Sequence, residues 1–349
     1  MRGRTSGVVA AAATALAAGL LLSGCGSPEV EAAPEEAPAQ LSPVPESIDA
    51  LKVTEEQALG ERTTRYFVET DLVPRDQLTD GRPSVVVTLP LDYDPELDYP
   101  VLYLLHGTDD SAVTWFQKGA VETVMAGLEA IVVQVEGGET GWYTDWSVEA
   151  DESRYWRSHH LDQVVPWVDE RFGTITESGG RAIAGTSAGG YGAISYAQQR
   201  PETFGTALSF SGVLSLESPQ VREMAGGEFA RATGNGNDVL GDGRETTEEQ
   251  WQDADPGLHV GRLENTAVAV YRGSGDRYES QIADTAEVFL DRAQEEGIDV
   301  ESYRYEELFE EEDPMPNGSR CTGGHEWSCW SGSLEHATPW IQEQIGEPR

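Results

Sequence analysis

A cluster of small residues around one serine is the feature that most narrows the folds open to this chain. The segment Arg181–Ala193 reads RAIAGTSAGGYGA, and around Ser187 stand Gly185, Ala188, Gly189 and Gly190. Glycine costs backbone entropy that other residues spare, so this crowding needs a reason. An apolar run before the cluster and a helix-forming run after it indicate a sharp strand-to-helix turn, whose small residues let the strand and helix approach each other. We therefore expect Ser187 to project from the end of a parallel strand as a nucleophile.

Strand-like and helix-like segments alternate on both sides of this turn. Short apolar, β-rich runs predict strands at 84–91, 99–107, 130–138, 181–185, 205–212, 266–276 and 298–305, and helical spacing of apolar residues predicts helices at 154–173, 188–201, 279–297 and 331–345. Such alternation is typical of βαβ units. The fold class expected is α/β, one doubly wound domain with a mostly parallel central sheet and helices on both faces. Residues 213–263 interrupt the rhythm and are expected to cross one edge of the sheet, and whether they act as a lid is left open.

The N-terminal region predicts export. Two arginines precede an apolar run over 8–22, which is too short for a transmembrane helix and is typical of a signal peptide. The run ends in LLSGC and resembles the lipobox of bacterial lipoproteins, which implies lipidation of Cys25 and anchoring to the outer face of the cell membrane; ordinary secretion with cleavage elsewhere is the alternative. We expect a signal peptide over 1–24, a disordered tether rich in proline, alanine and glutamate over 25–60, and a catalytic domain over 61–349.

The charge balance excludes some partners. The chain carries 62 acidic and 23 basic residues, a formal net charge of −39, and this repels nucleic acid. Only two of its basic residues are lysines, a surface composition that fits solubility in high salt. No metal-binding or phosphate-loop signature is found, and 234–243 lacks the spacing of a calcium loop, so neither a metal nor a cofactor is expected. The oligomeric state is left open, with a monomer as the working expectation.

A serine hydroxyl needs a base to become a nucleophile, and His325 has the best position among the six histidines. It lies in the segment CTGGHEWSCW after the last predicted strand, in a glycine-flanked loop. His106 precedes the serine, whereas a base in this kind of site follows it in the chain, and His336 falls inside the final predicted helix.

The acid and the oxyanion donors follow from the ends of other strands. Asp276 closes the strand run VAVYRGSGD, where a carboxylate could accept a hydrogen bond from the imidazole and hold its tautomer; Glu279 and Glu287 follow closely. Two backbone N–H groups are needed for an oxyanion. We expect one from Ala188, after the serine, and one from Thr108 (or its neighbour Gly107), after the strand run VLYLL.

Six motifs together resemble one family. They are LLHG, GWYTDW, GTSAGGYGA, SFSGVL, WQDADPGLHVGRL and GGHEWSCW, and they run in order through nearly the whole folded part. The chain resembles the esterase family of α/β-hydrolases, which includes the S-formylglutathione hydrolases (the esterase D group), feruloyl-type esterases and the antigen 85 mycolyltransferases. The resemblance implies an α/β-hydrolase fold, a triad of Ser187, Asp276 and His325, an oxyanion hole of Thr108 and Ala188, and two tryptophans, Trp327 and Trp330, beside the histidine.

Two departures from the mycolyltransferases bear on function. Where those enzymes follow the strand with aspartate, glycine and a sugar-contacting arginine, this chain has His106, Gly107, Thr108 and Asp109, so the arginine is missing. Their acid is a glutamate in the helix after the strand, whereas Asp276 stands where the esterases have theirs. Both differences favour a serine esterase acting on a small-molecule or lipid ester. Acyl transfer to trehalose or another carbohydrate, and a non-catalytic binding lipoprotein, are the alternatives.

Cysteines and aromatic residues complete the expected site. With Cys25 lipidated, Cys321 and Cys329 remain as a pair on either side of His325, and a disulfide is expected in an exported protein. A substrate pocket is expected from His106, Trp142, Tyr143, Trp146, Trp327 and Trp330. Packing in the core is the competing interpretation for each aromatic residue.

Overall fold

The computed structural model describes residues 48–78, 81–146, 154–240, 244–310 and 312–349. All of these residues belong to one compact unit. The predicted signal peptide and Cys25 therefore lie outside the described residues.

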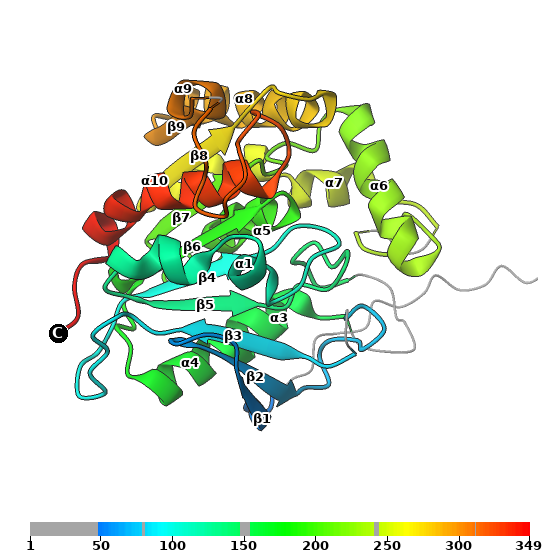
Figure 1. The fold of residues 1–349 in the computed structure, drawn as a ribbon. Coiled ribbons are helices and arrows are strands. Elements are labelled where there is room, and N and C mark those ends of the chain that lie inside the picture. The colour runs from blue at the N-terminus through cyan, green and yellow to red at the C-terminus, as the bar shows by residue number, and fades with distance from the viewer. Residues whose placement is uncertain (1–47, 79–80, 147–153, 241–243, 311) are drawn as a thin grey trace, which may run out of the picture. The chain divides into compact units, whose positions relative to one another are not determined.

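One central sheet organises the described part of the chain. Its nine strands are ordered β1-β2-β3-β5-β4-β6-β7-β8-β9 (Figure 1). The strands are β1 (Lys52–Ala58), β2 (Thr63–Glu69), β3 (Ser84–Thr88), β4 (Val101–Leu105), β5 (Ile131–Val135), β6 (Arg181–Thr186), β7 (Thr206–Phe210), β8 (Ala267–Arg272) and β9 (Val300–Arg304). From β5 to β9 every neighbouring pair is parallel, and β1, β2 and β3 join antiparallel at one side. The predicted α/β class with a mostly parallel sheet is confirmed.

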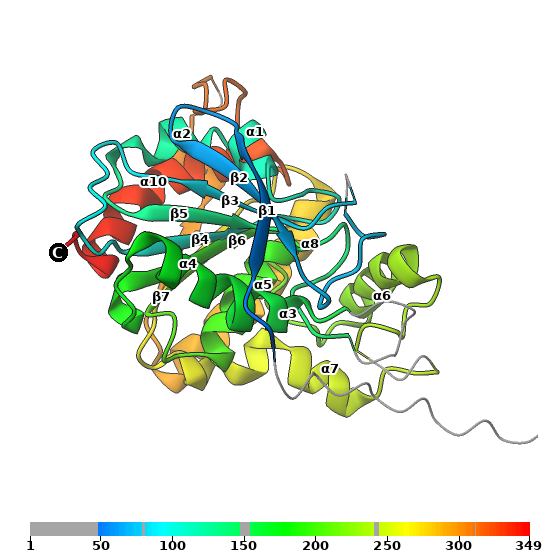
Figure 2. The ribbon, with the colours of Figure 1, turned by 90° about the horizontal axis from the view of Figure 1, so that it is seen from below.

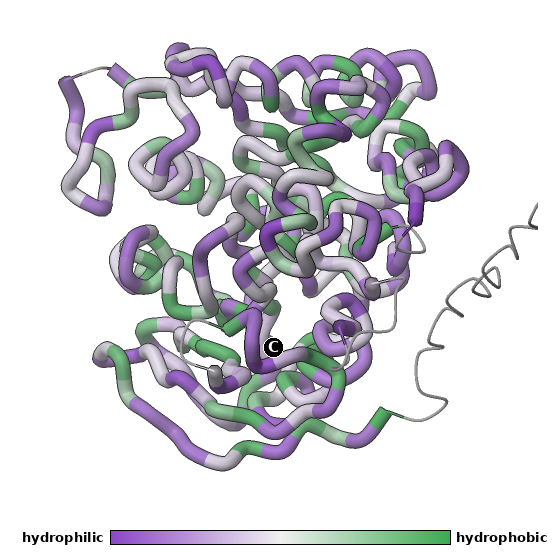
Figure 3. The backbone as a smooth tube through the Cα atoms, turned by 90° about the vertical axis from the view of Figure 1, so that its right-hand side faces the viewer, coloured by the Kyte–Doolittle hydropathy of each residue, from purple (hydrophilic) through white to green (hydrophobic). Residues whose placement is uncertain are grey.

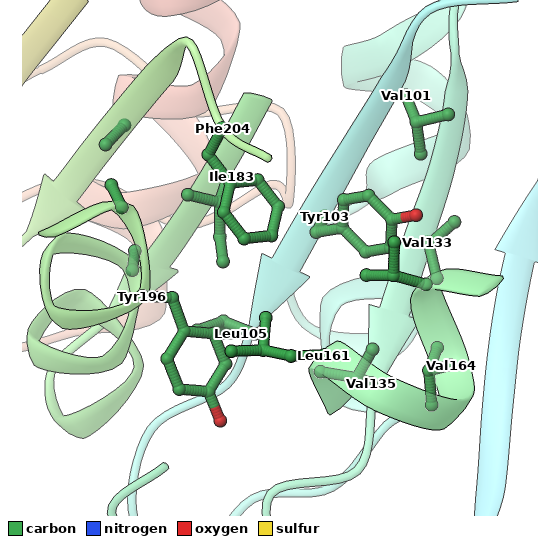
Figure 4. Close-up of a cluster of buried hydrophobic side chains, with 14 of the residues drawn as sticks. Val101, Tyr103, Leu105, Val133, Val135, Leu161, Val164, Ile183, Tyr196 and Phe204 are labelled. Atoms are coloured by element: carbon green, nitrogen blue, oxygen red, sulfur yellow. The ribbon is translucent and has the colours of Figure 1, made fainter. Parts of the chain in front are cut away.

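The central strands are buried on both faces. In β4, Val101, Tyr103 and Leu105 belong to one hydrophobic core, while the alternate residues Leu102 and Leu104 belong to another on the opposite face. Figure 4 shows the first core, with labelled side chains from β4, β5 and β6 and from the segments packed on them. Strands buried in this way read as continuous apolar runs, which is why the sequence reveals them clearly.

Helices cover the two faces of the sheet. The α-helices are α1 (Thr114–Gln117), α2 (Val121–Val124), α3 (Trp156–His159), α4 (Val165–Phe172), α5 (Ala188–Gln199), α6 (Pro219–Thr233), α7 (Glu248–Ala254), α8 (Arg277–Glu296), α9 (Tyr305–Leu308) and α10 (Trp327–Ile345). Figure 2 shows α1, α2 and α10 on one side of the strands and α3, α4 and α5 on the other. Hydrophobic and hydrophilic stretches alternate along the outer helices, as expected where one helix face packs inward (Figure 3). Among the described residues, no helix combines the length and apolar character needed to cross a membrane.

Short helical turns complete the architecture. The 3-10 segments are Met125–Gly127, Ser178–Gly180 and Pro256–Leu263, and a π-helical turn over His160–Val164 joins α3 to α4. The predicted helix over 154–173 is thus α3, this turn and α4 in succession.

Three differences from the predicted elements concern the sheet edge and the site. Strand β1 lies inside the range 25–60 that was expected to be a tether; it pairs with β2 at the sheet edge, and its mostly exposed, charged side chains hide it from hydrophobic patterning. Helix α8 begins at Arg277 rather than at residue 279, and α10 begins at Trp327 rather than at residue 331. The start of α8 at Arg277 changes the interpretation of the site.

Candidate active site

Ser187 lies at the turn between β6 and α5, as the sequence predicts. Its backbone has φ 53° and ψ −121°, a conformation that residues with a side chain rarely adopt. Its N–H donates to the carbonyl of Phe210 in the neighbouring strand end, at 2.9 Å. The strained turn is therefore fixed from the adjacent strand.

The glycines around the serine are required by close backbone approach. A Cβ added at Gly185 would lie 2.2 Å from the carbonyl oxygen of Gly189, and one at Gly189 would lie 2.5 Å from that of Leu105. These contacts are with backbone, which cannot swing aside as a side chain could. The small residues thus allow β6, α5 and the end of β4 to meet around Ser187.

His325 connects the serine to a buried carboxylate. Its Nε2 lies 2.9 Å from Ser187 Oγ, and its Nδ1 lies 2.7 Å from Oε2 of Glu279. The His325 side chain is 13% exposed, whereas the Glu279 side chain is fully buried. A serine, an imidazole and a carboxylate thus form one hydrogen-bonded line, the arrangement that activates a hydroxyl as a nucleophile.

The Glu279 carboxylate is held in place by further donors. Its Oε1 accepts hydrogen bonds from Ser211 Oγ and from the N–H of Gly273, both at 2.9 Å. Ser211 Oγ in turn accepts from Trp330 Nε1 at 3.0 Å. These donors fix the position of the carboxylate, so that its other oxygen, Oε2, faces Nδ1 of the imidazole.

The expectation that Asp276 accepts from the imidazole is corrected by this geometry. Asp276 is the N-cap of α8: its Oδ1 accepts from the N–H of Glu279 at 2.8 Å, and its Oδ2 accepts from the backbone N–H of His325 at 2.9 Å. Because α8 begins at Arg277, Asp276 caps the helix and Glu279, one turn further, points to the ring. The spacing D-x-x-E at a helix start could have revealed this, because it is the pattern of a capping residue followed by an acid at the third helical position.

Asp276 keeps its charge across the neutral range. Burial alone would raise the pKa of Asp276, but backbone hydrogen bonds from Glu279, His325 and Tyr278 outweigh it and lower the pKa below the ordinary 3.8. A lowered folded-state pKa means that capping by the carboxylate is fully present above the unfolded value and is lost only as the pH falls through the folded value.

Two backbone N–H groups beside the serine are free to bind an oxyanion. Gly107 lies against the serine, since a Cβ added there would be 3.2 Å from Ser187 Cβ, and Thr108 follows it after β4. Within the described residues, the N–H groups of Thr108 and Ala188 donate to no protein acceptor. The predicted oxyanion donors are thus available, one at the end of β4 and one at the start of α5.

Most of the residues expected to line a pocket are instead packed in the interior. His106, Trp142, Tyr143, Trp146 and Trp330 are each at most 4% exposed. Their polar atoms serve the structure: His106 donates from Nδ1 to the Gly107 carbonyl and accepts at Nε2 from the Gly137 N–H, and the Tyr143 hydroxyl donates to the His106 carbonyl. The competing interpretation, core packing beneath the loops, fits the placement of these residues.

Aromatic rings nevertheless enclose the imidazole. The Trp330 ring meets His325 edge to face at 4.9 Å, and the Tyr278 ring does so at 4.7 Å. Trp327 packs on Trp330 at 5.3 Å rather than on the histidine itself. The two rings restrict the orientation of the base from two sides.

The predicted disulfide between Cys321 and Cys329 is confirmed. It ties the loop that carries His325 to the first turn of α10. Both sulfurs also lie near a carboxylate oxygen of Glu326, close enough for the three to hold a metal ion, but sulfurs bonded to each other offer no thiolate for one.

Reduction of this disulfide is expected to lower turnover about tenfold, because small misplacements of a catalytic group cost up to a hundredfold. Loss of a crosslink closing so short a loop is also expected to cost about 2 to 3 kcal/mol of unfolding free energy. The measurement is ester turnover before and after reduction, with free thiols titrated, and a Cys321→Ser/Cys329→Ser variant serves as the control that ignores reductant. Full turnover with two titrated thiols would contradict the expectation.

The comparisons with known proteins point to one family. A profile of the family described as "Putative esterase" matches residues 77–341. Esterase Rv1288 of Mycobacterium tuberculosis is 41% identical over 137 residues, which are 38% of this chain and 30% of that protein. The chain thus matches about a third of the length of this relative.

Two further similarities cover more of the chain. Diacylglycerol acyltransferase/mycolyltransferase Ag85B of Mycolicibacterium smegmatis is 26% identical over 262 residues, which are 70% of this chain and 77% of that protein. The structure of an S-formylglutathione hydrolase from Agrobacterium tumefaciens superposes with a TM-score of 0.62 at 16% identity, over 84% of this chain and 99% of that one. At that identity the superposition shows the shared α/β-hydrolase fold alone.

Proposed function

We propose that this chain, a member of the esterase family, hydrolyses carboxylic esters through an acyl-enzyme on Ser187. The observation that carries the proposal is the hydrogen-bonded line from Ser187 Oγ through the His325 ring to the buried carboxylate of Glu279. Neither neighbour of the imidazole needs to move for a proton to pass between the serine and the ring.

The proposed reaction has two halves. His325 Nε2 takes the hydroxyl proton as Ser187 Oγ attacks the ester carbonyl carbon, and the N–H groups of Thr108 and Ala188 hold the resulting oxyanion. Collapse of this intermediate breaks the bond to the alcohol, which leaves with the proton from His325. Water then loses a proton to His325, attacks the acyl-enzyme and releases the acid and the free serine.

Acyl transfer to a carbohydrate is the second candidate, and one observation favours it. Of the two differences from the mycolyltransferases, the one in the acid does not hold in the structure, because Glu279 lies inside the helix after the strand and meets His325 there. Only the missing arginine after Thr108 remains. The similarity to Ag85B over most of its length adds to this candidate. A sugar hydroxyl would replace water in the second half of the same reaction.

The remaining parts of the proposal rest on the leader sequence. The LLSGC motif supports export of the chain and a lipid anchor on Cys25. The substrate would then be a small-molecule or lipid ester that reaches the protein outside the cell.

The function is tested by nitrophenol release from acyl esters of increasing chain length, with and without trehalose. Turnover with a burst of one equivalent, a preference for one chain length and no response to the sugar is expected of a hydrolase. A slow rate that rises with trehalose, with acylated sugar accumulating, would make the chain a transferase. Absence of both turnover and labelling by a fluorophosphonate would favour the non-catalytic binding protein instead.

A further inference from the structure

One carboxylate on α6 reaches three separate elements around the candidate site. Oε2 of Glu228 accepts hydrogen bonds from Thr108 Oγ1 at 2.9 Å and from Trp142 Nε1 at 2.8 Å, and Oε1 lies 3.4 Å from the Tyr278 hydroxyl. Thr108 follows β4, Trp142 follows β5 and Tyr278 stands in the first turn of α8. Helix α6 belongs to the segment 213–263, and Figures 1 and 2 show it beyond the end toward which β5 points.

We propose that Glu228 is a positioning residue that sets the orientation of the Thr108 peptide in the oxyanion-binding loop. The proposal rests on the esterase function proposed above. It gives the inserted helix α6 a part in the reaction without contact between α6 and the reacting atoms.

The loop after β4 needs such an external hold. Asp109, next to Thr108, has φ 63°, so the chain turns sharply at this point, and the Thr108 N–H has no acceptor of its own among the described residues. The N–H of Asp109 donates to the carbonyl of Glu139 at 2.8 Å, and the Thr108 hydroxyl is the group that ties Thr108 itself to α6. Hydrogen bonds to an ionised carboxylate are stronger than those between neutral groups, so Glu228 suits this task.

The negative charge of Glu228 indicates that this residue positions the loop and does not stabilise the oxyanion directly. A carboxylate near a developing oxyanion repels it and raises the energy of the transition state. Glu228 therefore does not stabilise the reaction electrostatically. Its benefit must come from preorganising an N–H donor, which is worth a large factor in rate because the donor then needs no reorganisation during the reaction.

The same carboxylate reaches the surroundings of the base. Tyr278, whose hydroxyl lies near Glu228 Oε1, places its ring 4.7 Å from the His325 ring at 85°. Trp142, the other donor, packs edge to face on Phe229, the neighbour of Glu228 in α6, at 5.3 Å. Glu228 thus connects Thr108, the proposed oxyanion donor, to Tyr278, whose ring packs against the imidazole.

Two variants and a matched control test the proposal. Glu228→Ala removes the acceptor and is expected to lower kcat about ten- to a hundredfold while KM changes less than about twofold, since the oxyanion exists only in the transition state. Glu228→Gln keeps an oxygen acceptor without the charge and is expected to retain turnover within about threefold of the parent. The control is Arg231→Ala on the same helix, which breaks an exposed ion pair with Asp109 and is expected to leave kcat and KM unchanged.

A double-mutant cycle with Thr108→Val tests whether Glu228 acts on turnover through the Thr108 hydroxyl. The valine keeps the backbone N–H and removes the hydroxyl that Glu228 accepts from. The loss in kcat for Thr108→Val/Glu228→Ala is expected to match that of Glu228→Ala alone, and not the sum of the two single losses, because both substitutions break the same hydrogen bond. Urea midpoints of all variants show that the fold is retained.

Several outcomes would overturn the positioning role. One is that the losses in kcat add in the double-mutant cycle, and another is that Glu228→Ala raises KM and leaves kcat unchanged. A third is that Glu228→Gln or Arg231→Ala loses as much kcat as Glu228→Ala does. If the parent protein turns over no ester, or turns it over without Ser187, the proposed function fails first and the role of Glu228 with it. If the parent is active through Ser187 and Glu228→Ala matches it, the positioning role alone fails.

Discussion

A Ser187→Gly variant is expected to lose about a millionfold in kcat and yet to unfold at a higher urea concentration than Ser187→Ala. The loss follows from removing the proposed nucleophile, since deletion of a serine in such a site costs about that factor. The gain in stability follows from the backbone at φ 53°, where glycine has no Cβ to strain. Serine at this position keeps a strained conformation that only function justifies.

The size of the stability difference can be bounded. Strain at an unfavourable φ and ψ costs about 1 to 3 kcal/mol, whereas glycine loses about 0.4 to 1 kcal/mol relative to alanine through the entropy of the unfolded chain. The unfolding free energy of Ser187→Gly is therefore expected to exceed that of Ser187→Ala by about 1 kcal/mol. The measurement is the urea midpoint of both variants at an unchanged slope. Equal midpoints would mean that the turn stores no strain, and residual turnover near the parental rate would exclude Ser187 as the nucleophile.

Replacing Glu279 with glutamine is expected to lower kcat by about a thousandfold to ten-thousandfold. In the serine protease triad, changing the acid to its amide costs about that factor, because the amide favours the wrong imidazole tautomer and cannot balance the imidazolium charge. Here the same argument applies to Glu279, whose Oε2 lies 2.7 Å from His325 Nδ1.

Asp276→Asn is the matched control for this prediction. Asparagine is as good an N-cap as aspartate, so α8 should keep its start and turnover should fall by no more than about tenfold. The measurement is kcat/KM for both variants on one nitrophenyl ester, with urea midpoints to show that both are folded. A larger loss of kcat/KM in Asp276→Asn than in Glu279→Gln would show that Asp276 and not Glu279 is the acid.

The sequence predicted the central strands and the serine turn well because each leaves a strong local pattern. Strand β4 is continuously apolar since it is buried on both faces, and the glycines near Ser187 are fixed by backbone contacts that no other residue could make. Strand β1 left no such pattern, since it is held by backbone hydrogen bonds at the edge and exposes charged side chains.

The acid was misassigned because two carboxylates lie within one helical turn. Which of them meets the imidazole depends on where α8 begins, and sequence patterns locate helix ends less well than helices. The aromatic residues were misassigned for a different reason. Trp142 and Tyr143 look the same in sequence whether they line a pocket or support a loop, and only tertiary packing distinguishes the two.

The shared cap at Asp276 has a consequence for inactivation by heat. One carboxylate holds the N–H of Glu279 and the N–H of His325, so the first turn of α8 and the loop of the base are fastened at a single point. Helix ends open locally at a lower free energy than the whole domain. Fraying of this one turn would separate acid and base together while the sheet stays intact. Activity should therefore decline on warming before the bulk of the secondary structure melts, and it should recover on cooling from that interval.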